Sequence, residues 1–90
     1  MTDAVSLAEA KAFLRVTDDA EDSLVSLLIG AAQARVEIAT GLTLDEDSAA
    51  PLRLAILMLV AHGFEHREAG EAPVGLVEPW IAPYRVVRLT

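Results

Sequence analysis

The stretch PLRLAILMLVAHGFEHR, residues 51–67, decides the fold. Pro51 suits the first turn of a helix, where its missing N–H leaves no hydrogen bond unmade. The positions that follow are apolar on almost every side of a helix, namely Leu52, Leu54, Ala55, Ile56, Leu57, Met58, Leu59, Val60, Ala61 and Phe64. A helix that is apolar all round is buried in a core. The stretch therefore predicts a central core helix over residues 51–67.

A second long helix is predicted just before it, over residues 20–40, and Gly41 suits the position after a helix C-terminus. Its polar positions form one narrow stripe, which consists of Ser26, Gly30, Gln33, Glu37 and Thr40. Apolar residues cover both flanks of that stripe. Such a wide apolar face is more than a chain of 90 residues covers by itself, so we expect a neighbouring subunit to bury part of it.

A short first helix is predicted from Leu7 to Leu14. Ser6 and Glu9 have the spacing of a capping box, in which each side chain accepts a hydrogen bond from the backbone N–H of the other residue. Asp18 or Asp19 is suited to cap the second helix. The expected fold is all-α, a small bundle of about three helices in the order short, long, long.

The chain beyond the core helix has a different texture. Residues 69–75 hold two glycines and a proline and predict a loop, and Val77 to Ile81 predict a short helical turn. An extended, β-prone arm follows from Tyr84 to Thr90 and is suited either to strand addition on another protein or to a frayed or self-packed tail. We expect residues 1–75 to form a helical domain and 76–90 its C-terminal arm, within one domain.

Composition narrows the function classes. The net charge is −7, and residues 1–50 hold ten acids against three bases, so DNA binding that reads sequence is not expected. There are no cysteines, which excludes disulfides and thiol catalysis. The start of the chain does not resemble a signal peptide. The most apolar run, Leu54 to Ala61, is shorter than the roughly 20 residues that span a bilayer, so neither membrane nor export is expected.

The segment from His62 to His66 matches H-x-x-E-H, a zinc-peptidase pattern. Two histidines one helical turn apart can share a metal, but a catalytic zinc usually needs a third protein ligand. The candidates Glu68, Glu71 and Glu78 all lie in or beside a loop or the tail. Histidines at a helix C-terminus are also stabilised by the helix dipole without any metal. We therefore expect structural histidines, no metal, no cofactor and no enzyme.

Several segments together resemble a known family. They are V-S-L-A-E-A-K-A-F-L-R-V (5–16), D-D-A-E-D (18–22), E-I-A-T-G (37–41), L-A-I-L-M-L-V-A-H (54–62), F-E-H-R-E (64–68) and A-P-Y-R-V-V-R-L (82–89). The chain resembles the small head–tail connector proteins of tailed phages, also called adaptor or DNA-packaging connector proteins. Relatives of that family occur in prophages and gene transfer agents. The family typically has Tyr-Glu-Asn-Arg where this chain has Phe64 to Arg67, so His66 is a substitution within a family segment.

The resemblance implies a virion structural protein of the neck, assembled in the bacterial cytoplasm. Such proteins form a ring, dodecameric in the particle, that docks beneath the portal protein. The ring joins the portal to a stopper or tail terminator and lets DNA pass through its lumen. It also implies that the C-terminal segment binds the portal, here through Trp80, Tyr84, Arg85, Val86, Val87, Arg88 and Leu89. Glu65 and Arg67 are expected to make structural or subunit-interface polar contacts.

Two further hypotheses remain open from the residues. An acidic lumen surface, including Asp45, Glu46 and Asp47, would let DNA slide without binding. In a different class, the size and acidity of the chain also suit a small cytosolic helical regulator or an antitoxin-like binding module. Such a module would form a dimer rather than a ring. A zinc hydrolase is the remaining candidate.

Overall fold

The computed structural model describes residues 3–66 and 74–85, and within these ranges it contains helices and no strand. The α-helices are α1 (Leu7–Leu14), α2 (Asp22–Thr40), α3 (Ala50–Glu65) and α4 (Glu78–Ile81). Two short 3-10 helices, η1 (Val74–Leu76) and η2 (Ala82–Tyr84), flank α4. The predicted all-α class, with a short helix, two long helices and a C-terminal helical turn, is confirmed.

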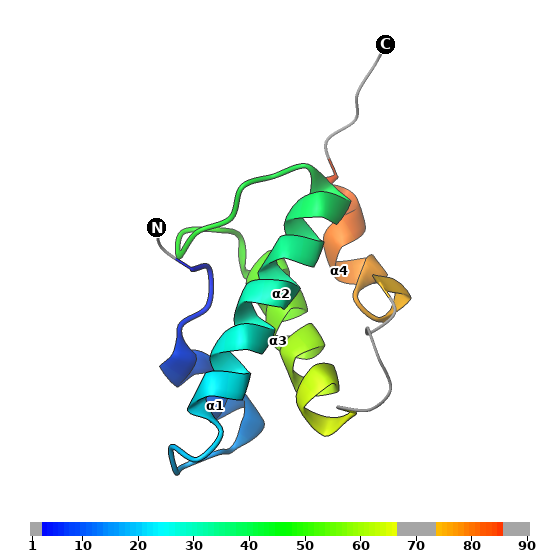
Figure 1. Cartoon of the computed structure of the whole chain (residues 1–90). Helices are drawn as coiled ribbons and strands as arrows, with labels where there is room; N and C mark the ends of the chain where they lie inside the picture. Colours follow the sequence, from blue (N-terminus) through cyan, green and yellow to red (C-terminus); the bar gives the residue numbers. More distant parts are fainter. Residues whose placement is uncertain (1–2, 67–73, 86–90) are drawn as a thin grey trace.

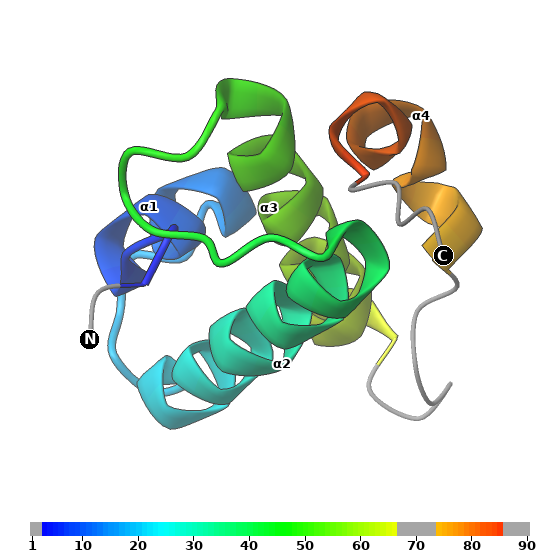
Figure 2. The ribbon, with the colours of Figure 1, turned by 90° about the horizontal axis from the view of Figure 1, so that it is seen from above.

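The two long helices form the centre of the molecule. α2 and α3 run side by side in opposite directions. The loop of residues 41–49 that joins them, the α2–α3 loop, passes along one edge of the pair (Figure 1). α1 and α4 lie on opposite sides of this pair in both views (Figures 1 and 2). Both short helices contact α2 and α3, so each of them closes one side of a common core.

The core is aliphatic and draws on every α-helix, including Ala10 of α1 and Ile81 of α4. α3 contributes Leu52, Ala55, Ile56, Leu59 and Val60, and α2 contributes Val25, Ile29, Ala32 and Val36. The predicted role of residues 51–67 as the core helix therefore holds for the described part of that stretch. α3 begins at Ala50 with Pro51 in its first turn, as the sequence predicts, and its described end is Glu65.

The beginning of the fold follows the local sequence signals. Ser6 Oγ accepts a hydrogen bond from the Glu9 N–H, and Glu9 Oε1 accepts one from the Ser6 N–H, both at 3.0 Å. An ion pair of 2.8 Å between Lys11 Nζ and Asp22 Oδ1 ties α1 to the start of α2. At the other end of α2, Gly41 has φ 80° and donates its N–H to the Glu37 carbonyl, as predicted for a helix end.

The start of α2 differs from the prediction. The residue at its N-cap is Glu21, which makes no side-chain capping hydrogen bond. Asp18 instead accepts a hydrogen bond from the Ala20 N–H at 3.2 Å, within the turn that precedes the helix. The expected cap by Asp18 or Asp19 is therefore wrong. An Asp side chain can close a local turn two residues on as readily as it caps a helix.

Candidate functional site

The C-terminal segment is attached to the core by two apolar side chains. Val77 precedes α4 and Ile81 ends it, and they are 1% and 0% exposed. They are four residues apart and therefore lie on one face of the helical turn. Pro79 occupies the first turn of α4, where a missing N–H breaks no hydrogen bond. The short helix thus has a fixed orientation on α3 and α2.

Arg85 holds the end of this segment in place. Its Nε donates a hydrogen bond to the Ala39 carbonyl at 3.1 Å, near the end of α2. Its Nη2 donates to Glu78 Oε2 at 2.6 Å, and Nη1 pairs with Glu78 Oε1. The bond to Glu78 raises the pKa of the Arg85 guanidinium above its ordinary value. Arg85 therefore binds both Glu78 of α4 and the end of α2, and so joins these two helices.

Two aromatic residues of the segment have different surroundings. Trp80 is 42% exposed on α4, while Tyr84 is partly buried and packs against the core. Of the residues expected to bind the portal, the structure describes Trp80 on α4, Tyr84 at the end of η2 and Arg85 directly after it. Val86, Val87, Arg88 and Leu89 lie outside the described residues.

The end of α3 borders an apolar hollow of about 280 Å³. It is lined by Phe13, Met58, Ala61, His62, Glu65, His66 and Leu76. Glu65 is exposed and makes no ion pair with the described part of the chain, and its predicted companion Arg67 lies outside the described residues. The polar contacts expected of these two residues stay a prediction.

The two histidines of the H-x-x-E-H pattern contact each other. Their rings stack with centroids 4.5 Å apart, and the His66 N–H donates to the His62 carbonyl at 2.9 Å. His66 Nδ1 lies 3.1 Å from the same carbonyl. Within residues 3–66 and 74–85, no group of three or more His, Cys, Asp or Glu side chains is arranged to hold a metal ion. Both histidines lie at the end of α3, and the buried His62 Nδ1 has no hydrogen-bond partner among the described residues.

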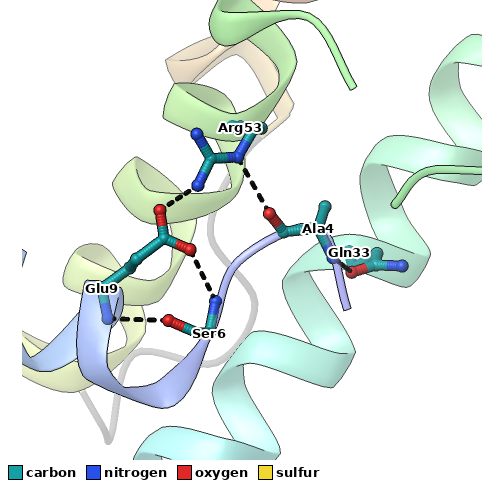
Figure 3. A network of polar contacts seen from close by, with 5 residues as sticks. All are labelled: Ala4, Ser6, Glu9, Gln33 and Arg53. Atoms are coloured by element: carbon teal, nitrogen blue, oxygen red, sulfur yellow. Dashed lines mark hydrogen bonds and ion pairs between the residues drawn. The ribbon is translucent and has the colours of Figure 1, made fainter. Parts of the chain in front are cut away.

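A polar network that the sequence analysis did not find holds the first residues of the chain (Figure 3). Arg53, on α3, donates from Nε to the Ala4 carbonyl at 2.9 Å and pairs with Glu9. Gln33, on α2, accepts a hydrogen bond from the Ala4 N–H at 2.8 Å. The Glu9 carboxyl has a lowered pKa, first because the Ser6 N–H donates to it and then because Arg53 does.

The same part of α2 also binds the α2–α3 loop. Gln33 Nε2 donates to the Leu44 carbonyl at 3.1 Å, and Glu37 Oε2 accepts from the Leu44 N–H at 2.8 Å. Leu44 itself is buried. Much of the predicted polar stripe on α2 therefore binds backbone groups of other segments. The only local signal for this role was the helical spacing of Gln33 and Glu37.

Comparison with known families decides the class of protein. A family model described as phage gp6-like head-tail connector protein matches residues 4–74, which is most of the chain. The chain belongs to this connector family. The family is one of structural components of the phage neck that are generally non-enzymatic, and membership implies association with portal and tail components. No curated protein and no solved structure matches the chain.

The family match covers α1, α2, α3 and the N-terminal network, and it ends at the first residue of η1. α4, η2 and Arg85 lie beyond it. The connector family therefore accounts for the helical body. The way in which the C-terminal segment is attached is a feature seen in this chain's own structure.

Proposed function

We propose that this connector protein forms a ring, dodecameric in the particle, at the junction between head and tail. In this proposal the ring docks beneath the portal through the C-terminal segment and joins it to a stopper or tail terminator. DNA passes through the lumen without sequence-specific binding. Membership of the connector family supports the place in the particle.

The attachment of α4 is the observation that carries the portal-binding part. Val77 and Ile81 fix the helix in the core, and Arg85 fixes its end to α2. Trp80 is left 42% exposed on a rigid support. Tryptophan, tyrosine and arginine are the side chains most often found as interface anchors, and a preorganised anchor loses little conformational freedom on binding.

The residues after Arg85 extend this surface in the proposal. Val86 and Val87 are β-branched and Leu89 is apolar, which suits addition to a strand of another protein, and Arg88 adds a cation between them. They start from a point that Arg85 holds in place. Trp80 and residues 86–89 are therefore assigned the portal contacts, while Tyr84 and Arg85 position them.

The charge of the chain supports passage of DNA rather than binding to it. The net charge of the chain is −7, and Asp45, Glu46 and Asp47 are exposed on the α2–α3 loop. Phosphate groups are bound by clustered lysines and arginines, and an acidic surface repels them. We assign this acidic α2–α3 loop to the surface of the ring that faces DNA in the lumen.

Binding to portal-containing heads tests the proposal. Two variants separate docking from folding: removal of residues 86–90, which leaves Arg85 in place, and Trp80→Ala. Thr43→Ala, at an exposed position of the α2–α3 loop, is the surface control. We expect truncation to abolish co-sedimentation with heads and Trp80→Ala to weaken it about ten-fold or more. The helical signal and the control stay as in the parent chain. Undiminished binding of both variants would refute portal docking through this segment.

A further inference from the structure

One face of α2 is turned away from the core and is apolar. We call it the outer face of α2; its residues are Ser23, Leu27, Gly30, Ala31, Ala34 and Ile38. All six are exposed and none is charged, and Leu27 and Ile38 are 71% and 83% exposed. Large side chains exposed together on one helix face, rather than scattered, mark an interaction surface. The small residues between them allow another surface to approach closely.

The second apolar surface is the hollow beside α3. Gly63 faces Leu28 of α2, because a Cβ at that position would lie 2.7 Å from Leu28 Cδ2. At about 100° per residue, Met58 and Ala61 lie roughly 140–160° around α3 from Gly63. The hollow, which they line with Phe13, Leu76, the two histidines and Glu65, therefore opens on the side of α3 away from α2. Phe13 is 44% exposed and Leu76 is 38% exposed.

The two surfaces differ in shape and lie on opposite sides of the helix pair. One is a row of projecting side chains on α2, and the other is concave. When a surface of one copy fits a different surface of the next copy, the contact repeats in one direction and generates a closed ring if the rotation permits. A self-complementary patch would instead give a dimer.

Charge limits where a second copy of this chain can approach. Two chains of net charge −7 repel each other, so the contact has to avoid placing acids of one copy against acids of the other. Glu65 lines the hollow, while Asp18 and Asp19 lie in the turn before α2 and Asp45, Glu46 and Asp47 lie on the α2–α3 loop. The outer face of α2 is the uncharged approach.

We propose that the outer face of α2 of one copy packs on the next copy so that Ile38 seats in the hollow lined by Phe13, Met58 and Leu76. Leu27, about 16.5 Å away along α2, packs beside that hollow. This inference rests on the proposed ring and assigns its subunit contact. It also gives the excess apolar surface of α2 an occupant. By length and composition α2 would be able to cross a membrane, with 28% of the tested window buried, so a lipid surface is the alternative that the experiment has to separate.

Cysteine pairing in assembled particles tests the contact, because the chain has no cysteine of its own. Pairs of variants are co-expressed, one with Leu27→Cys or Ile38→Cys and the other with Phe13→Cys or Leu76→Cys, and the particles are oxidised. We expect at least one mixed pair to form a disulfide-linked dimer, and the matching double variant to form a ladder of higher multiples. Ile38→Cys on its own should not cross-link. Cross-linking of Ile38→Cys to itself, or no cross-link in any mixture, would overturn the proposal.

A charge substitution gives an independent readout. Ile38→Glu places a carboxylate in the contact, whereas Ser26→Glu places one on the same helix but outside the outer face. We expect Ile38→Glu to keep its helical signal and to reduce incorporation into particles at least ten-fold, and Ser26→Glu to incorporate normally. Normal incorporation of Ile38→Glu would overturn the contact. Binding of the parent chain to anionic liposomes that is lost in Ile38→Glu would assign the face to lipid instead.

The outcome for the proposed function is read separately. If the chain is absent from particle necks altogether, the connector role itself fails. If the chain is present and joins heads to tails but no mixed pair cross-links, only the assignment of the contact fails.

Discussion

Arg85 and Ala39 are 46 residues apart in the sequence, and a hydrogen bond of 3.1 Å joins the guanidinium of one to the carbonyl of the other. The last carbonyls of a helix lack partners within the helix. Arg85 satisfies one of these carbonyls at the end of α2 while it pairs with Glu78 of α4. The contact fixes the C-terminal segment to the part of the molecule that the connector family shares.

Substitution of Arg85 tests this attachment. Arg85→Lys keeps the charge but cannot donate to Ala39 and to both Glu78 oxygens at once, because an ammonium lacks the planar fork of a guanidinium. We expect faster amide hydrogen exchange in α4, with a larger effect for Arg85→Ala, and little change in the protection of α3. Arg88→Ala serves as the control. Unchanged exchange in α4 of Arg85→Ala would show that Val77 and Ile81 alone hold the helix.

Gln33 is expected to stabilise the fold through two backbone groups. Gln33→Ala removes the bond from the Ala4 N–H and the bond to the Leu44 carbonyl. At about 0.5–1.5 kcal/mol for each neutral hydrogen bond, the free energy of unfolding should fall by about 1–3 kcal/mol. Urea denaturation measures this change. The exposed Ser26→Ala on the same helix should stay within about 0.5 kcal/mol of the parent, and an equally small effect at Gln33 would contradict the role.

Acidification should weaken the attachment of α1 through Glu9. The pKa of this carboxyl is lowered in the folded chain, so its stabilising contribution is present above the ordinary value of 4.5 and is lost as the pH falls through the lowered one. Glu9→Gln should therefore reduce stability at neutral pH and flatten its fall on acidification. The midpoint of thermal unfolding, measured from pH 7 to pH 3, tests this prediction. Glu46→Gln on the α2–α3 loop is the control. Parallel curves for Glu9→Gln and the parent would refute it.

Two helical glycines are expected to respond differently to alanine. A Cβ at Gly30 meets nothing within 4 Å, so Gly30→Ala should raise the free energy of unfolding by about 0.5–1 kcal/mol through helix propensity. A Cβ at Gly63 lies 2.7 Å from Leu28 Cδ2, and the leucine has to move. Gly63→Ala should therefore gain less stability than Gly30→Ala. The reverse order in denaturation experiments would contradict the packing of α3 on α2.

The acidic residues of the α2–α3 loop are expected to affect DNA passage. Replacing Asp45, Glu46 and Asp47 by lysine should slow DNA delivery while particle assembly stays intact, because the new cations bind phosphates. Asparagine and glutamine at the same positions remove the negative charge but keep an acceptor for the hydrogen bond from the residue 47 N–H to residue 45, so they control for the loss of charge without added cations. Delivery at the parent rate by an assembled lysine variant would remove these acids from the lumen.

The sequence predicted those parts of the fold that depend on neighbouring residues. The capping box of Ser6 and Glu9, the end of α2 at Gly41 and the first turn of α3 at Pro51 each require only a few adjacent positions. The core role of α3 follows from its composition. The incorrect cap at Asp18 arose because two local hydrogen-bond patterns compete for the same side chain.

Contacts between distant segments had no such signal. Arg53 meets the Ala4 carbonyl across 49 residues, and Arg85 meets Ala39 across 46. A guanidinium in a tail suggests an external partner equally well, so the sequence could not show that Arg85 binds its own chain. The two apolar surfaces were likewise hidden, because the pattern of α2 predicts a wide apolar face without showing which part α3 covers.

Electron cryo-microscopy of the particle neck tests the central claim most directly. The account predicts a closed ring of this chain between portal and tail, in which Trp80 and residues 86–89 of each copy contact the portal. A neck that lacks this chain, or a ring that meets the portal through another part of the chain and leaves Trp80 in solvent, would contradict the account.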